Sequence, residues 1–122
     1  MKIKIEDMLA AADAASTLLK ALANRHRLII ICQLIENERS VGQLAELLRL
    51  RDSTVSQHLA LLRRDGLVSA RRDGQTIWYA IASGPARAVV QVLYRAYCAA
   101  PAPKPRRGAL RGAAHAAVAR NQ

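Results

Sequence analysis

The sequence predicts a mainly helical fold that carries one small β-hairpin. Apolar residues make up 52% of the 122 residues and no Phe is present, so Leu, Ile, Val and Ala must form the core. Such a composition is typical of closely packed helices. Apolar positions recur at helical spacing over most of residues 6–66, and an alternating pattern replaces this spacing over residues 67–81. A chain of this length has room for one domain of ordinary size.

Two helices are expected over residues 6–23 and 25–35. In the first, Leu9 and Leu19 belong to a helically spaced apolar set, and neighbouring Ala residues would let another helix approach closely. Asn24 stands directly before the second helix and belongs to the residue types that cap helix N-termini.

A third helix follows over residues 41–48. Ser40 and Gln43 have the spacing of a capping box, in which each side chain accepts a hydrogen bond from the other residue's backbone N–H. A fourth helix, which Asp52 or Ser53 is expected to cap, ends near the next glycine. Its expected core-facing residues are Val55, Leu59 and Leu62.

A β-hairpin is expected after the fourth helix. Two alternating segments, residues 67–72 and 75–81, flank an Asp-Gly dipeptide at 73–74, which is a strong signal for a tight hairpin turn. A fifth helix begins at Gly84 and continues to about residue 97, before a proline-rich stretch stops it.

The tight connection between the third and fourth helices, followed by the hairpin, predicts a winged helix-turn-helix domain over residues 1–100. Residues 101–122 are expected to form a basic, disordered tail. The net charge is +10; residues 1–73 carry 12 basic and 9 acidic residues, and residues 74–122 carry seven basic residues and no acid. This excess favours double-stranded DNA as a partner, because Lys and Arg neutralise its phosphates. A merely solvated basic tail is the alternative.

The fourth helix presents a polar face opposite its apolar one. Short hydrogen-bonding side chains near the N-terminus of such a helix suit base edges in the major groove, and Gln57 can make a bidentate contact to adenine. Taken one by one, these residues are better explained by helix capping or solvation. His58 lies toward the core side, which indicates packing or phosphate positioning. The candidate DNA-contacting residues of this helix are Ser53, Thr54, Ser56, Gln57 and His58.

Four arginines bracket the surface that would face a duplex. Arg63 and Arg64 end the fourth helix, and Arg71 and Arg72 precede the hairpin tip. We expect contacts to phosphates or the minor groove from these guanidinium groups, although a solvated face explains any one of them.

At these residues the sequence resembles the ArsR-type winged-helix repressors. The resemblance covers roughly residues 15–99 and is carried by the segments LKALANRHRLIIICQL, DSTVSQHLALLRRDGLV and ARRDGQTIWYAI. It implies a homodimer joined by the first and last helices, which binds an inverted-repeat operator and is released by an inducer. The family's DNA-reading positions then fall on the five candidate residues of the fourth helix, and its wing falls on Arg71 to Gln75.

Metal sensing, which is common in that family, fits this chain poorly. Metal-sensing members use a Cys-x-Cys pair at the start of the reading helix, or Asp and His on the last helix. Residues 49–54 contain no Cys, and the expected fifth helix contains no His, Asp or Glu. Two thiols alone cannot complete a tetrahedral zinc site within one subunit. We therefore expect no metal ligands and no cofactor, and a metal-responsive repressor is the weaker alternative.

Cys32 and Cys98 lie on the second helix and at the end of the fifth, 66 residues apart. If these helices pack together, as the resemblance implies, the two thiols are neighbours. Their positions resemble those of the subgroup that joins two thiols, through a disulfide or a longer polysulfide bridge, in response to persulfides or oxidants. For Cys32, which follows three Ile residues, a buried inert thiol is the alternative.

The sequence is therefore interpreted as that of a transcriptional repressor that leaves its operator when the two cysteines are oxidised or bridged by a persulfide. A sequence-neutral, nucleoid-type DNA-binding protein is the alternative that the charge supports. An enzyme is not expected, because the sequence has no glycine-rich phosphate loop and no recognisable catalytic grouping. No apolar run approaches the ~20 residues of a membrane-spanning helix, and acidic residues interrupt any export signal, so a cytoplasmic protein is expected.

Overall fold

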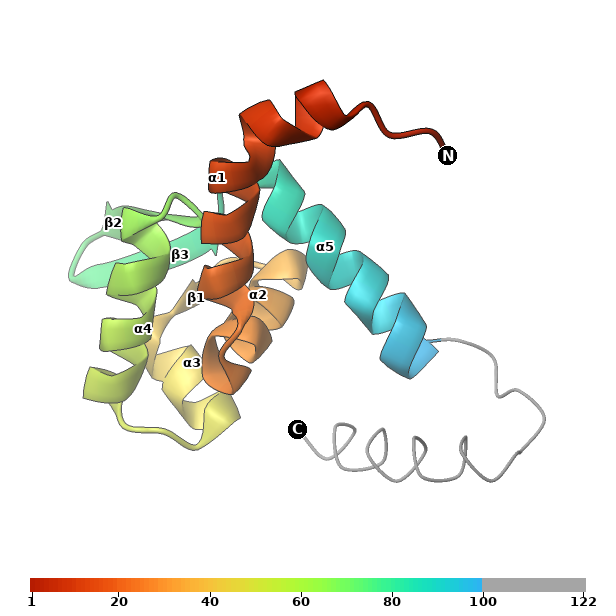
Figure 1. The fold of residues 1–122 in the computed structure, drawn as a ribbon. Helices are drawn as coiled ribbons and strands as arrows, with labels where there is room; N and C mark the ends of the chain where they lie inside the picture. Colours follow the sequence, from red (N-terminus) through yellow and green to blue (C-terminus); the bar gives the residue numbers. More distant parts are fainter. Residues whose placement is uncertain (100–122) are drawn as a thin grey trace.

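The structure is a computed structural model that describes residues 1–99 (Figure 1). The expected tail, residues 101–122, lies outside this part of the chain. In chain order the elements are α1 (Ile5–Leu22), α2 (Arg25–Glu36), β1 (Arg39–Ser40), α3 (Val41–Leu48), α4 (Asp52–Arg64), β2 (Val68–Asp73), β3 (Thr76–Ile81), α5 (Gly84–Tyr94) and the π-helical turn η1 (Arg95–Ala99). The predicted helices and hairpin occur in the predicted order, so the mainly helical winged helix-turn-helix fold is confirmed.

The hydrophobic core lies between α2, α3, α4, α5 and one face of the sheet, with α1 packed against α2 (Figure 1). Val55, Leu59 and Leu62 of α4 are fully buried, as their spacing predicted. Other fully buried side chains come from α2, α3 and α5: Ile30, Ile31, Leu44 and Val90. Burial of each large aliphatic side chain contributes about 1.5–3 kcal/mol, and this fixes which face of each helix remains outside.

The sheet has three antiparallel strands in the order β1-β3-β2. The β2–β3 hairpin was predicted, whereas β1 was not, because a strand of two residues has no alternating pattern to detect. Arg71 pairs with Trp78 across the hairpin, and Trp78 pairs with Ser40 of β1, so these three residues share one face of the sheet. The neighbouring Tyr79 belongs to the opposite face and packs against the core.

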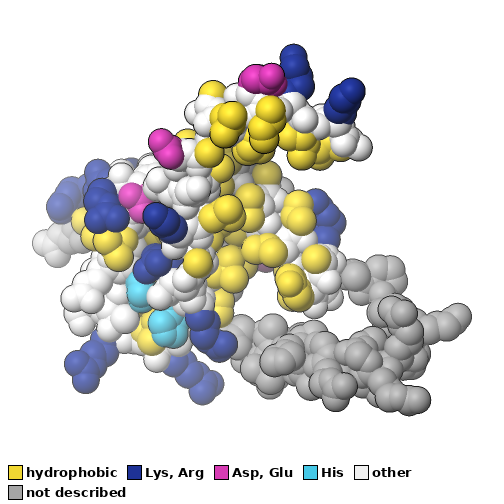
Figure 2. All heavy atoms as spheres, viewed as in Figure 1, with side chains coloured by type: hydrophobic (Ala, Val, Ile, Leu, Met, Phe, Trp, Pro, Cys, Tyr) yellow, Lys and Arg dark blue, Asp and Glu magenta, His cyan; other side chains and the backbone are white. Residues whose placement is uncertain are grey.

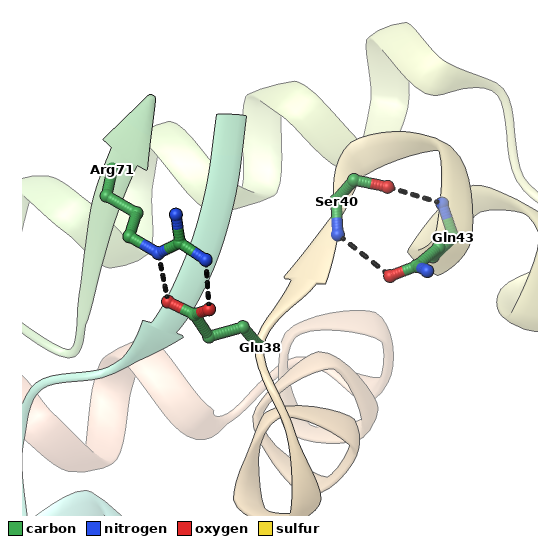
Figure 3. A network of polar contacts seen from close by, with 4 residues as sticks. All are labelled: Glu38, Ser40, Gln43 and Arg71. Carbon is green, nitrogen blue, oxygen red and sulfur yellow. Dashed lines mark hydrogen bonds and ion pairs between the residues drawn. The ribbon is translucent and has the colours of Figure 1, made fainter. Parts of the chain in front are cut away.

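Two of the three predicted helix caps are present. The Asn24 side chain accepts hydrogen bonds from two backbone N–H groups at the start of α2, and Ser40 and Gln43 form the capping box of α3 (Figure 3). The prediction that Asp52 or Ser53 caps α4 was wrong. Arg51 is the N-cap, and its side chain makes no capping hydrogen bond within the described residues. Asp52 is the first residue of the helix itself. Its carboxylate interacts favourably there with the positive end of the helix dipole and does not cap a backbone N–H.

α5 and the N-terminal turns of α1 project from the body of the domain on the side away from the wing, whereas the rest of α1 lies along the body (Figure 1). Figure 2 shows apolar side chains gathered along both helices. The large ones that remain exposed there are Ile5, Met8, Leu9, Leu19, Val92 and Tyr94, together with Tyr97 of η1. α5 passes into η1 rather than continuing as a regular helix, a change that helical spacing did not predict. None of the helices in the described range is long and apolar enough to span a membrane.

Candidate nucleic-acid interface and thiol pocket

The outward face of α4 carries the candidate DNA-reading residues. Ser53, Ser56 and Gln57 are exposed, and Thr54 is half-buried. They occupy the first two turns of the helix, where short side chains with hydroxyl and amide groups can reach base edges in the major groove. The structure therefore brings these four predicted residues together on one outward-facing surface.

The turn before α4 sets the angle of this surface. Arg49 adopts a left-handed backbone conformation with φ of 58°, and the Leu50 N–H donates to the Ala45 carbonyl at 3.0 Å. This arrangement satisfies a carbonyl at the end of α3 and turns the chain sharply toward α4.

His58 is half-buried between the reading face and the core face of α4, as predicted. The imidazole ring of His58 lies 5.7 Å from that of His26 at the start of α2, centroid to centroid, and Figure 2 shows histidine side chains at the surface of the domain. The Nδ1 atom of His58 is buried and has no hydrogen-bond partner among residues 1–99. Burial, followed by the positive charges of Arg27 and His26, lowers the pKa of His58, so the neutral imidazole is favoured.

The four candidate arginines are all exposed but have different partners. Arg64 lies 3.3 Å from the carboxylate of Asp65, and Arg71 forms two hydrogen bonds with Glu38 (Figure 3). Within the described part of the chain, neither Arg63 nor Arg72 lies within ion-pair distance of a carboxylate. The wing residue Gln75 is exposed at the hairpin turn.

Sequence reasoning missed Glu38, which lies 33 residues before Arg71. No local pattern connects the two positions. Only the register of β1 on β3 and of β3 on β2 brings them to the same face of the sheet. The pair could have been predicted only if the sequence had indicated strand β1.

Cys32 and Cys98 line one cavity of about 460 Å³ between α2 and the segment formed by α5 and η1, in which Cys98 belongs to η1. Cys32 is half-buried, Cys98 is exposed, and both are free thiols. Leucine, isoleucine and valine side chains form much of the wall, with Tyr94, Tyr97 and Arg25 at its polar positions. Burial raises the pKa of the Cys32 thiol, and a negative charge on Cys98 raises it further.

Known proteins are similar to this chain in sequence and in fold. Residues 24–70 match the model of the family described as bacterial regulatory protein, arsR family. The chain is 46% identical over 98 residues to the transcriptional activator HlyU of Vibrio cholerae, a match that covers 80% of this chain and 91% of the relative. The chain belongs to the ArsR family.

Two solved structures of other proteins are similar to the described fold. The transcriptional repressor BigR of Xylella fastidiosa has a TM-score of 0.74 at 36% identity, over 79% of this chain and 98% of that chain. A homodimeric winged helix-turn-helix DNA-binding domain of Mycobacterium bovis has a TM-score of 0.66 at 31% identity, over 79% and 89% of the two chains. This ArsR-family chain is accordingly a DNA-binding transcriptional regulator and not an enzyme. Among residues 1–99, no three His, Cys, Asp or Glu side chains are grouped as metal ligands.

Proposed function

We propose that this chain is a homodimeric transcriptional repressor whose operator affinity is lost when Cys32 and Cys98 become covalently bridged. The observation that carries the proposal is that both thiols line the same cavity, between the helix α2 of the core and the outer segment formed by α5 and η1. A bond between them would tie these two elements together. The similar protein BigR is named a repressor, which supports the direction of regulation.

Reading of the operator is assigned to the outward face of α4. Ser53, Thr54, Ser56 and Gln57 contact bases or phosphates of one half-site, and His58 helps to position this helix. Arg63, Arg64, the wing arginines and Gln75 contact the backbone or the minor groove. Two copies related by a two-fold axis would read the two halves of an inverted repeat.

The role of Gln57 is tested with an operator selected by the protein from a pool of random duplexes. Gln57→Ala should weaken binding to the selected duplex by ~1–3 kcal/mol and leave binding to random duplex unchanged, because the lost contact is to a base edge. Gln91→Ala, an exposed Gln on α5, is the matched control and should change neither affinity. Equal losses on both duplexes would rule out base reading by Gln57. A failure to enrich any sequence would instead favour the sequence-neutral alternative.

The chemistry of the switch follows from the exposure of the two thiols. The exposed Cys98 thiolate attacks the outer sulfur of a persulfide, RS–SH. This step forms Cys98–S–SH, and the rest of the persulfide leaves as the thiol RSH. The Cys32 thiolate then attacks Sγ of Cys98, releases H₂S and forms the disulfide. The two cysteine thiols are oxidised, and one persulfide is reduced to a thiol and H₂S. If a second persulfide first extends Cys98–S–SH by one sulfur, attack on the middle sulfur of that chain gives a trisulfide with release of H₂S.

Release of DNA follows if the bridge changes how α5 lies in the dimer. The distance between the two α4 helices must match the half-site spacing, so a small rotation of the subunits removes one reading helix from its groove. A loss of ~10²-fold in affinity requires only about 2.7 kcal/mol of coupling between the bridge and DNA binding.

The switch is tested by DNA binding and intact-protein mass spectrometry after persulfide treatment. Cys32→Ser and Cys98→Ser should each bind DNA as the reduced wild type does, and neither should release it on treatment. The wild-type mass should fall by two hydrogens for a disulfide, or gain sulfur for a longer bridge, and a thiol reductant should reverse the change. Bridge formation should accelerate as the pH rises, because the pKa of Cys32 is raised and its thiolate must form. Normal release by either single variant would refute the dithiol mechanism and favour an inert core role for the altered cysteine.

A further inference from the structure

Glu38 and Arg71 form a bidentate ion pair at the base of the wing. Arg71 Nε donates to Oε2 of Glu38 at 2.8 Å, and Nη2 donates to Oε1 at 2.7 Å (Figure 3). Two parallel, charge-assisted hydrogen bonds of this length engage one edge of the guanidinium group completely. This edge of the wing residue Arg71 is therefore already occupied by a carboxylate of the same chain.

The sheet register explains why the two side chains meet. Arg71 of β2 lies on the face that also carries Trp78 of β3 and Ser40 of β1. Glu38 precedes Ser40 by two residues and lies on the same side, so Arg71 reaches it across β3. The next residue, Arg72, belongs to the opposite face and has no carboxylate within ion-pair distance among residues 1–99.

A carboxylate offers Arg the same two-oxygen edge as a DNA phosphate. We propose that Glu38 is an internal competitor of DNA phosphate for the Nε–Nη2 edge of Arg71, so that the wing uses this edge on DNA only by giving up the Glu38 pair. This inference rests on the wing contacts assigned under the proposed function. The side chains of Arg71 and Glu38 are 54% and 38% exposed, so a phosphate can reach the guanidinium group from solvent.

The pair also remains charged under ordinary conditions. The hydrogen bonds from Arg71 lower the pKa of Glu38, and those to Glu38 raise the pKa of Arg71. The consequence is a wing that contributes less sequence-independent affinity than its two arginines would suggest. Contacts from α4 then account for a larger share of the operator affinity.

The competition is tested with Glu38→Gln, measured on random-sequence duplex and on the selected operator. The substitution keeps the size of the side chain and removes the charge that holds Arg71. We expect binding to both duplexes to tighten by about 2- to 5-fold, the range that a released surface ion pair allows. Glu36→Gln is the matched control: Glu36 lies two residues away, is exposed, and pairs with Arg39 at 3.6 Å instead of with Arg71. It should change affinity less than Glu38→Gln does.

A double-mutant cycle separates competition from a general effect of charge. In an Arg71→Ala background, Glu38→Gln should give no more tightening than Glu36→Gln does, because no arginine is left to release. Persistence of the full gain without Arg71 would overturn the proposal. Weaker binding by Glu38→Gln, with an unchanged melting temperature, would also overturn it and would mean that the pair positions the wing for DNA. Glu38→Ala provides a second variant with the same expected direction.

The random-duplex arm distinguishes this inference from the proposed function. Phosphate contacts do not depend on sequence, so the cycle can be read on random DNA even if no operator is enriched and no cysteine bridge forms.

Discussion

His58 illustrates how one residue of the reading helix is shared between packing and the DNA-facing surface. Its ring is held beside His26, and its buried Nδ1 atom has no hydrogen-bond partner in the described part of the chain. A proton on this ring would place a positive charge near Arg27 and His26 at a partly desolvated position. The folded state therefore favours the neutral ring.

This preference predicts a pH dependence of stability. The folded-state pKa of His58 lies below its ordinary value of 6.5, so its contribution is present above about that pH and is lost as the pH falls through the lower folded-state pKa. His58→Leu, which cannot titrate, should lose less stability than the wild type between pH 8 and pH 5. The measurement is the melting temperature of both proteins across that range. Parallel curves would contradict a contribution from His58.

At the scale of the element, hydrogen bonds accepted by the Asn24 side chain and donated by the Arg27 side chain hold the junction of α1 and α2. Asn24 Oδ1 accepts from the backbone N–H groups of His26 and Arg27 at 3.0 and 3.1 Å. Arg27 Nε donates to the Ala21 carbonyl, near the end of α1, at 2.7 Å. Backbone N–H groups at the start of α2 and a backbone carbonyl near the end of α1 thus have hydrogen-bond partners at the same corner.

Loss of the Asn24 cap should therefore destabilise the domain. Asn24→Ala leaves two backbone N–H groups of α2 without their side-chain acceptor, and we expect a loss of about 1 kcal/mol in the free energy of unfolding. Chemical denaturation of the reduced protein measures it. Asn24→Ser, which keeps a capping oxygen, should retain most of the stability. An unchanged value for the Ala variant would show that water replaces this cap at no cost.

At the scale of the whole molecule, the exposed apolar faces of α1 and α5 are the main unexplained surface of the single chain. Leu9 is 68% exposed and Tyr97 is 72% exposed. Apolar surface of this extent marks a protein interface, and a second copy of the chain is the partner that the proposed homodimer provides. The geometry of that interface would set the distance between the two reading helices.

The dimer is tested by Leu9→Glu. A carboxylate at this position would have to be buried without a partner, and we expect dimer dissociation to become easier by about 10-fold or more, with a matching loss of operator binding. Analytical ultracentrifugation over a range of concentrations measures the first effect. Leu47→Glu, at an exposed leucine of α3, is the control and should leave the dimer intact. Unchanged association of the Leu9 variant would exclude α1 from the interface.

Much of the molecule is determined by local sequence. Helical spacing located α1 to α5, the Asp-Gly dipeptide located the hairpin, and Asn24 and Ser40 identified two helix starts, because each signal depends on residues a few positions apart. The outward set on α4 was equally readable, since its buried face follows from the spacing of Val55, Leu59 and Leu62.

Tertiary structure alone decided the features that join distant segments. Strand β1 exists because β3 offers it a hydrogen-bonding edge, and this pairing brings Glu38 to Arg71. The cavity shared by Cys32 and Cys98 depends on the packing of α5 on α2, which the family resemblance implied but no local pattern could establish. Local sequence fixes periodicity and backbone preference, whereas contacts between residues far apart in the chain depend on how complete elements pack.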